Sequence, residues 1–190
     1  MLLSELARPT RHELIGRDVE VKELIYNSRK VKNGDVFCCI VGTFADGHKY
    51  AQQAVDAGAA ALVVERKLDI DVPQILVEDT RIAMAEMAAA YYGYPSREMQ
   101  MIGVTGTNGK TSTTYMLKAI AERMGKKVGL IGTIRNMIGD IIIDTERTTP
   151  ESVDLQRILR QMKDEKVDVV IMEVSSHSLD QKRVHGIEYD

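Results

Sequence analysis

The fold of this chain is decided by residues 101–112, which read Met101-Ile102-Gly103-Val104-Thr105-Gly106-Thr107-Asn108-Gly109-Lys110-Thr111-Ser112. A short apolar run leads into a glycine-rich turn, and a helical pattern begins directly after it. Glycine lets consecutive backbone N–H groups converge on phosphate oxygens, because no Cβ blocks the approach. A helix that follows adds unpaired N–H groups and a partial positive charge. This order of strand, turn and helix predicts a phosphate-binding loop.

The polar side chains of the loop predict which phosphates it binds. Lys110 supplies a mobile cation for β- and γ-phosphates, and the hydroxyl of Thr111 is placed to ligate Mg²⁺. The match to the general phosphate-loop pattern is imperfect, because Val104 stands where the first glycine is expected. A hairpin turn at Asn108 and Gly109 is the structural alternative.

The whole chain predicts two α/β units, a first domain at 1–98 and a second at 99–190. In the first unit we expect strands at 35–41, 59–64 and 74–77, a helix near 51–58, and a helix capped by Asp79. In the second we expect strands at 101–105, 128–131 and 167–174, with a hairpin within 134–144. The helix after the loop should carry an apolar stripe of Leu117, Ile120, Ala121 and Met124. A later helix should be capped by Thr149, with Pro150 at its first position.

Composition narrows the class of protein. The net charge of −3 and the pI of about 5.9 argue against a nucleic-acid surface. No apolar run approaches the ~18 residues of a membrane span. Cys38 and Cys39 are adjacent in an apolar run and are expected to be core thiols rather than a disulfide. Glu5 and Arg8 argue against a signal peptide, so a cytoplasmic protein is expected.

The second unit has about three expected parallel strands, fewer than the ~5 or more of most doubly wound sheets. We therefore expect the chain to be the front part of a longer protein. Its oligomeric state is not predicted by the sequence.

A second polar cluster follows the buried strand that ends near residue 173. Ligands of open α/β sheets bind beyond the carboxyl ends of the strands, where Glu173 is placed to hold Mg²⁺ directly or through water. A helix-capping or salt-bridged carboxylate is the alternative for Glu173. His177 is expected near the site, either as a hydrogen-bonding residue or as a metal ligand.

Two further clusters have both a structural and a functional interpretation. The segment 147–150 is expected to begin a helix, and its hydroxyls could equally bind an anion. The segment 181–183 could be a solvated charged face, or Arg183 could pair with a carboxylate.

Together these motifs resemble the Mur ligase family, the ATP-dependent amide-forming enzymes of peptidoglycan synthesis. Residues 105–111 match the family's phosphate loop, which lacks the early glycine, and residues 173–179 resemble its second motif. Residues 27–31, 34–37, 41–47 and 148–150 resemble the members that add the third residue of the peptide. The resemblance implies an N-terminal uridine-nucleotide-binding α/β domain, followed by the first part of a doubly wound, parallel-sheet ATPase domain.

The resemblance also implies binding roles. ATP would be bound by Gly106, Thr107, Asn108, Gly109, Lys110, Thr111 and Ser112. Thr111 and Glu173 would bind Mg²⁺, and Lys110 and Glu173 would be the catalytic residues. The uridine nucleotide would contact Ser28, Thr43, Phe44 and Ala45. The muramoyl dipeptide would be held by Thr148, Thr149, Ser175, Gln181 and Arg183. Arg147 stands where some members have asparagine and is left out of the site.

The implied reaction uses ATP to add a diamino acid, meso-diaminopimelate or L-lysine, to UDP-N-acetylmuramoyl-L-alanyl-D-glutamate through an acyl phosphate. By the same resemblance, the family's carbamylated lysine, a later metal-binding histidine and the domain that selects the amino acid are expected downstream of Asp190. The 190 residues alone are therefore expected to be inactive as a ligase. A ligase resembling folylpolyglutamate synthetase and a non-catalytic nucleotide-binding module are the alternatives.

Overall fold

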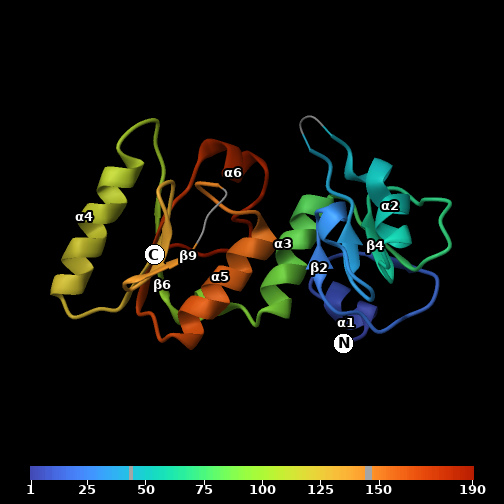
Figure 1. Ribbon diagram of the computed structural model, residues 1–190, viewed down its shortest axis with the longest axis horizontal. Helices are drawn as coiled ribbons and strands as arrows, with labels where there is room; N and C mark the ends of the chain where they lie inside the picture. Colours follow the sequence, from blue (N-terminus) through green and yellow to red (C-terminus); the bar gives the residue numbers. More distant parts are fainter. Residues whose placement is uncertain (43–44, 144–146) are drawn as a thin grey trace. The chain divides into compact units, whose positions relative to one another are not determined.

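The computed structural model describes residues 1–42, 45–143 and 147–190, which form two compact units, Met1–Tyr91 and Tyr92–Asp190 (Figure 1). Each unit has helices and its own five-stranded sheet, which confirms the predicted α/β class. The expected domain limits at residues 98 and 99 remain a prediction. Within the described ranges, every helix is too short or too polar to cross a membrane.

The sheet of the first unit has the order β1 (Glu13–Ile15), β5 (Gln74–Leu76), β4 (Ala61–Val64), β3 (Val36–Cys38) and β2 (Leu24–Ile25). β2, β3, β4 and β5 run parallel, and β1 pairs antiparallel with β5. The strands expected at 35–41, 59–64 and 74–77 are confirmed at shorter lengths. β1 and β2 were not predicted, because each offers only two consecutive apolar residues, which directly follow a glutamate.

Helices cover this sheet on both faces. α2 (Ala51–Asp56) packs against one face, where its alanines contact Phe37 and Leu62. Successive strand residues point to opposite faces, and Cys38 donates from the other face to the carbonyl of Thr80, at the start of α3 (Thr80–Tyr91). α1 (Leu3–Ala7) lies against α3. Asp79 caps α3 as predicted, since its Oδ1 accepts from the backbone N–H groups of the second and third helical residues.

The two cysteines are core thiols, as predicted. Both are free and buried. Burial disfavours the thiolate, so it raises the pKa of Cys38 well above its usual range and the pKa of Cys39 to about 12. Thiols that stay protonated in the core are poor nucleophiles.

The sheet of the second unit has the order β6 (Gln100–Val104), β10 (Val169–Glu173), β7 (Val128–Ile131), β8 (Asn136–Ile138) and β9 (Ile141–Ile143). β6, β10 and β7 are the three expected parallel strands, and β10 lies between the other two. β8 and β9 form the expected hairpin, which joins the sheet through antiparallel pairing of β8 with β7. A short 3₁₀ helix, η3 (Pro95–Glu98), precedes β6.

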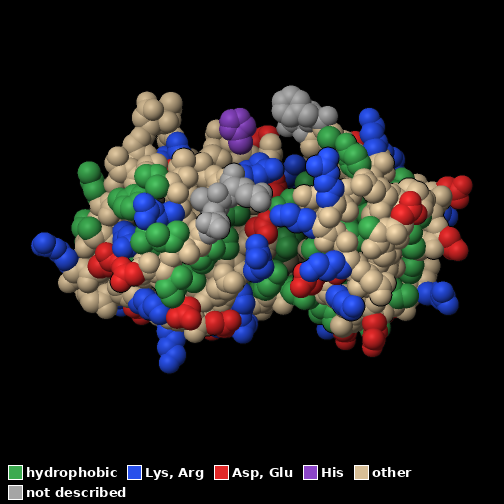
Figure 2. Space-filling view, viewed as in Figure 1, with side chains coloured by type: hydrophobic (Ala, Val, Ile, Leu, Met, Phe, Trp, Pro, Cys, Tyr) green, Lys and Arg blue, Asp and Glu red, His purple; other side chains and the backbone are tan. Residues whose placement is uncertain are grey.

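α4 (Lys110–Arg123) and α5 (Ser152–Asp164) cover opposite faces of this second sheet (Figure 1). The predicted stripe of α4 is only half correct. Leu117 and Ala121 pack against the sheet, whereas Ile120 and Met124 are 57% and 72% exposed. Leu117 and Ala121 are four residues apart and lie on the face of the helix that contacts the sheet. Ile120 and Met124 lie on a neighbouring face that is exposed to solvent. Apolar side chains are accordingly visible over α4 in Figure 2.

The predicted start of α5 is wrong by two residues. The helix begins at Ser152 with Glu151 in the capping position, so neither Thr149 nor Pro150 has the expected place. The reason is that the hydroxyl of Thr149 is engaged elsewhere. It donates to the carbonyl of Glu173 at 2.8 Å and accepts from the backbone N–H of Ser175 at 3.2 Å.

In the first unit, an ionic network holds the chain directly after Ala45. Oδ1 of Asp46 accepts from the backbone N–H of His48 and lies 2.6 Å from its Nδ1. Oδ2 accepts from Arg66 at 2.7 Å. His48 is buried, and its Nε2 accepts from the backbone N–H of Glu65. The hydrogen bond from Arg66, followed by those from His48, keeps the pKa of Asp46 below its usual range.

This network predicts an acid-sensitive contribution to stability. A carboxylate whose pKa is depressed by folding stabilises the native state above its unfolded pKa of about 3.9, and the contribution is lost as the pH falls below that value. We expect Asp46→Asn to lower the free energy of unfolding by about 1 to 2 kcal/mol at neutral pH. The difference should shrink below about pH 4. Urea unfolding from acid to neutral pH measures it, with the exposed Asp71→Asn as control. A difference that does not depend on pH would contradict this account.

Candidate functional site

The carboxyl ends of β6, β10 and β7 meet at one edge of the second sheet. The register pairs Glu173 with Val104 on β6 and Met172 with Ile131 on β7. Glu173 therefore lies level with the start of the phosphate loop on one side and with Gly132 on the other. Three polar segments from distant parts of the sequence are thus brought together by strand pairing alone.

The phosphate loop has the conformation that its glycines allow. Gly106 and Gly109 have φ angles of +146° and +81°, which side chains rarely adopt. Gly109 is the capping residue of α4, so the chain passes from the turn directly into the helix. This geometry excludes the hairpin alternative, because no returning strand follows Gly109. Nζ of Lys110 folds back over the loop and donates to the carbonyl of Gly106 at 2.7 Å.

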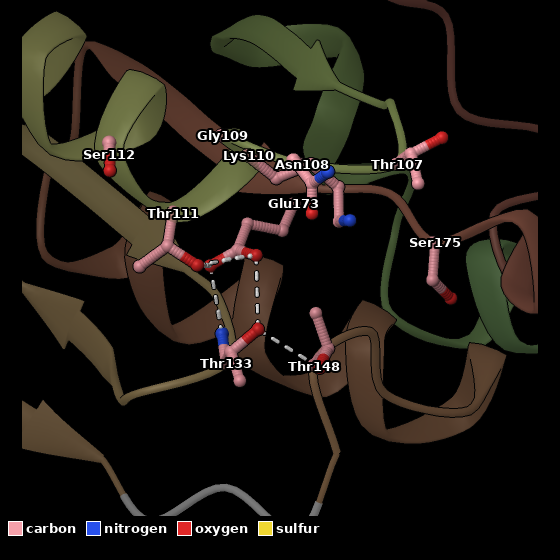
Figure 3. A pocket seen from close by; sticks show the side chains of 10 residues that line it. All are labelled: Thr107, Asn108, Gly109, Lys110, Thr111, Ser112, Thr133, Thr148, Glu173 and Ser175. Carbon is pink, nitrogen blue, oxygen red and sulfur yellow. Dashed lines mark hydrogen bonds between the residues drawn. The ribbon is translucent and has the colours of Figure 1, made fainter.

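The carboxylate of Glu173 joins the phosphate loop to the end of β7. Its side chain is buried, with 1% exposed. The hydroxyl of Thr111 lies 3.0 Å from both carboxylate oxygens. From the other side, Thr133 donates its backbone N–H to Oε1 and its hydroxyl to Oε2, each at 3.0 Å. Figure 3 shows Glu173 between these two threonines.

A hollow of about 350 Å³ opens above this carboxylate. Most of its lining consists of residues singled out in the sequence, namely Thr107, Asn108, Gly109, Lys110, Thr111, Ser112, Thr148, Glu173 and Ser175. Thr107 and Ser175 lie on the side of the hollow away from Thr111 (Figure 3). The structure thus places six of the seven expected ATP-binding residues, all except Gly106, beside two of the residues expected to bind the dipeptide.

Other expected residues lie outside the lining. Thr149 is buried beneath the hollow, where it ties the end of β10 to the segment before α5. Arg183 donates to the carbonyl of Thr149 and to the side-chain oxygen of Gln181. His177 is exposed on the short helix α6 (Ser176–Asp180) and does not line the hollow.

The residues expected to contact uridine are in the first unit. Ser28 begins the 3₁₀ helix η1 (Ser28–Lys30) and lies 3.3 Å from the side chain of Gln53. Ala45 is exposed, and its carbonyl accepts from the backbone N–H of Gly42. Thr43 and Phe44 lie outside the described residues.

Thr133 lines the hollow but was not identified from the sequence. It is the second residue after β7. Like Glu173, it therefore lies at the carboxyl end of a parallel strand, where ligands of open α/β sheets bind. Applying that rule to every expected parallel strand would have found it. Its hydroxyl also lies 3.1 Å from that of Thr148.

The residues around Glu173 fit a magnesium ion. The hydroxyls of Thr111 and Thr133 and the carboxylate itself are hard oxygen donors, which Mg²⁺ prefers. Mg²⁺ usually needs only one or two carboxylates when substrate phosphates supply further oxygens. Among the described residues, no group of three or more His, Cys, Asp or Glu side chains is arranged to hold a metal. The donor set therefore suits a metal shared with a bound phosphate chain.

Comparison with protein families identifies both units. Residues 20–92 match the family model described as the Mur ligase family catalytic domain. Residues 104–190 match the model described as the Mur ligase middle domain.

Similar proteins agree with these matches. The UDP-N-acetylmuramoyl-L-alanyl-D-glutamate--2,6-diaminopimelate ligase of Clostridium botulinum is 53% identical over 175 residues, which are 90% of this chain and 36% of that protein. A solved structure of a ligase of the same name covers 100% of this chain and 39% of its own, with a TM-score of 0.80 at 24% identity. The Thermotoga maritima MurF ligase in complex with ADP covers 85% of this chain and 34% of its own, with a TM-score of 0.53 at 25% identity.

These proteins are longer than this chain, which spans 36% of the Clostridium relative. The likeness at 24% identity concerns the fold alone. The family models, by contrast, match the sequence itself, and the two together account for most of its length. The chain therefore belongs to the Mur ligase family.

Proposed function

We propose that this chain forms part of a cytoplasmic, ATP-dependent ligase of peptidoglycan synthesis. The whole protein would add 2,6-diaminopimelate to UDP-N-acetylmuramoyl-L-alanyl-D-glutamate. The observation that carries the proposal is the contact of the buried Glu173 carboxylate with Thr111 in the phosphate loop. The choice of substrates is supported by the 53% identity to a ligase of that name.

ATP would be bound through its phosphates at the loop. The backbone N–H groups of residues 106–112 and the N-terminus of α4 offer donors to the phosphate oxygens. The ammonium of Lys110 would leave the carbonyl of Gly106 and stabilise the negative charge that develops on the γ-phosphate. Mg²⁺, held at Thr111 and Glu173, would supply further charge neutralisation at the phosphates.

The muramoyl dipeptide would be held beside the phosphates. Thr148 and Ser175 line the same hollow as the loop, and Thr149, Gln181 and Arg183 lie next to them. An oxygen of the terminal D-glutamate carboxylate would attack the γ-phosphorus, and ADP would leave. The amine of the diamino acid would then attack the acyl carbon, lose a proton and expel phosphate. Most of the rate gain would come from positioning and charge stabilisation.

The uridine nucleotide of the same substrate would be bound by the first unit. Ser28 and Ala45, together with Thr43 and Phe44, are the residues proposed for this contact. The hydrogen bond between Gly42 and Ala45 and the Asp46 network fix the position of Ala45, which supports its proposed contact with the nucleotide.

The reaction itself tests the proposal. The whole protein is incubated with ATP, Mg²⁺, UDP-N-acetylmuramoyl-L-alanyl-D-glutamate and either meso-diaminopimelate or L-lysine. We expect the UDP-linked tripeptide to form with diaminopimelate, with one ADP released for each product, as measured by chromatography. Absence of any tripeptide with either amino acid would refute the proposed function.

Lys110→Ala should abolish ligation while leaving the fold intact. The ammonium is the mobile cation of the loop, and removal of one such electrostatic contact costs roughly 100-fold or more in rate. Turnover is measured by tripeptide formation, and folding by thermal denaturation. Lys126→Ala is the matched control, because it removes the same charge beyond the far end of α4. Near-normal turnover in Lys110→Ala would contradict the assignment.

Thr133→Val should lower the affinity for Mg²⁺. The variant keeps the shape of the side chain but removes the hydroxyl that donates to Glu173. Loss of a partner that orients a metal ligand typically costs about 10- to 100-fold in metal affinity. We expect the Mg²⁺ concentration for half-maximal rate to rise about tenfold, and calorimetry of ATP with Mg²⁺ to show the same loss of affinity. Thr133→Ser should behave as the wild type, and equal behaviour of both variants would exclude a role for the hydroxyl.

A further inference from the structure

Glu151 is a buried carboxylate that lies between two guanidinium groups. It is 3% exposed, directly before α5. Nη1 of Arg147 donates to its Oε1 at 2.7 Å, and Nε of Arg183 lies 3.1 Å from the same oxygen. The side chain of Arg147 is 48% exposed, whereas that of Arg183 is 10% exposed. The two ion pairs therefore differ in how much solvent screens them.

The carboxylate does not cap the helix that it precedes. Glu151 occupies the capping position of α5, but its side chain makes no capping hydrogen bond. Glutamate is also not among the residues favoured at this position. Its interactions with the two arginines account for its orientation. The role of a carboxylate at this position therefore depends on the groups that those arginines contact.

Arg183 depends on Glu151 more than Arg147 does. A charged group that is almost completely buried is strongly destabilised unless an opposite charge accompanies it. An exposed pair contributes little, because water and salt screen it. Removing the charge of Glu151 would thus disturb the position of Arg183 and leave the exposed Arg147 largely unaffected.

Arg183 in turn connects Glu151 to the wall of the hollow. Its Nη1 donates to the carbonyl of Thr149 at 3.0 Å, and its Nη2 donates to Oε1 of Gln181 at 2.6 Å. The hydroxyl of Thr149 donates to the carbonyl of Glu173 at the end of β10 and accepts from the backbone N–H of Ser175, which follows that strand. A continuous set of contacts therefore runs from Glu151 through one guanidinium to two residues that line the hollow.

We propose that Glu151 is a positioning residue for binding of the muramoyl dipeptide, acting through Arg183 on Gln181 and Thr149. This inference rests on the proposed function, in which Thr149, Gln181 and Arg183 hold that substrate. It assigns no contact between Glu151 and the substrate itself. The phosphate loop receives its shape from other contacts, so the binding of ATP should not depend on Glu151.

Steady-state kinetics of the whole protein test the proposal. Glu151→Gln should raise the KM for UDP-N-acetylmuramoyl-L-alanyl-D-glutamate about tenfold, while the KM for ATP changes less than about twofold. Arg183→Lys should have a similar effect. Both changes disrupt the same interaction between Glu151 and Arg183, so the KM of the double variant should be little higher than that of either single variant. Additive effects, or equal rises in both KM values, would overturn the proposal.

Two further variants separate positioning from stability. Arg147→Asn removes the exposed partner and should change the KM for the dipeptide less than about twofold. Glu151→Asp keeps the charge at a shorter reach, so it folds more readily and should give a KM between those of the wild type and Glu151→Gln. If Glu151→Asp and Glu151→Gln lower the melting temperature without changing this KM, Glu151 is only a structural ion pair and the proposal is wrong.

Calorimetry distinguishes failure of this inference from failure of the proposed function. UDP-N-acetylmuramoyl-L-alanyl-D-glutamate is titrated into the wild type and the Glu151 variants in the absence of the diamino acid. Binding by the wild type that weakens in Glu151→Gln supports the positioning role even if no ligation is observed. Wild-type binding that is unchanged in the variant overturns this role alone, and a wild type that does not bind the substrate overturns both proposals.

Discussion

The second unit depends on the buried carboxylate of Glu173, which is contacted by two segments of the chain. Glu173 can accept from Thr111 and Thr133 at the same time only because β10 lies between β6 and β7 and ends level with both. Burial of a carboxylate is costly unless hydrogen bonds compensate for the lost water. The threonines provide that compensation, and in doing so they fix the phosphate loop relative to the rest of the sheet edge.

The same crowding explains why Gly132 stands beside Glu173. A Cβ built on Gly132 would lie 2.5 Å from Oε1 of the carboxylate, closer than any real contact. The hydrogen bond from the backbone N–H of Gly132 to the buried Asn136 then sets the turn that leads to Thr133. The position of the carboxylate is thus determined by backbone geometry on one side and by hydroxyl groups on the other.

Much of this arrangement could be predicted from the sequence, because the signals were local. The phosphate loop combines glycines, a lysine and a following helix within 12 residues, and the continuous apolar run before Glu173 marks a strand buried on both faces. Thr133 stands at the end of an expected strand, but its contact with Glu173, 40 positions away, and that of Glu151 with Arg183, 32 positions away, arise only in the tertiary fold. The start of α5 differs from the prediction for the same reason, because the hydroxyl of Thr149 donates to the carbonyl at the end of β10 rather than capping the helix.

The burial of Cys38 and Cys39 has a practical consequence for experiments in solution. These are the chain's two cysteines, and both are shielded thiols whose pKa is raised. A cysteine introduced at an exposed position outside the hollow, such as His177 on α6, would react with a maleimide fluorophore far faster than either natural one. The native chain therefore already offers a low background for site-specific labelling. The emission of such a label would report on the arrival of a nucleotide without prior removal of either natural cysteine.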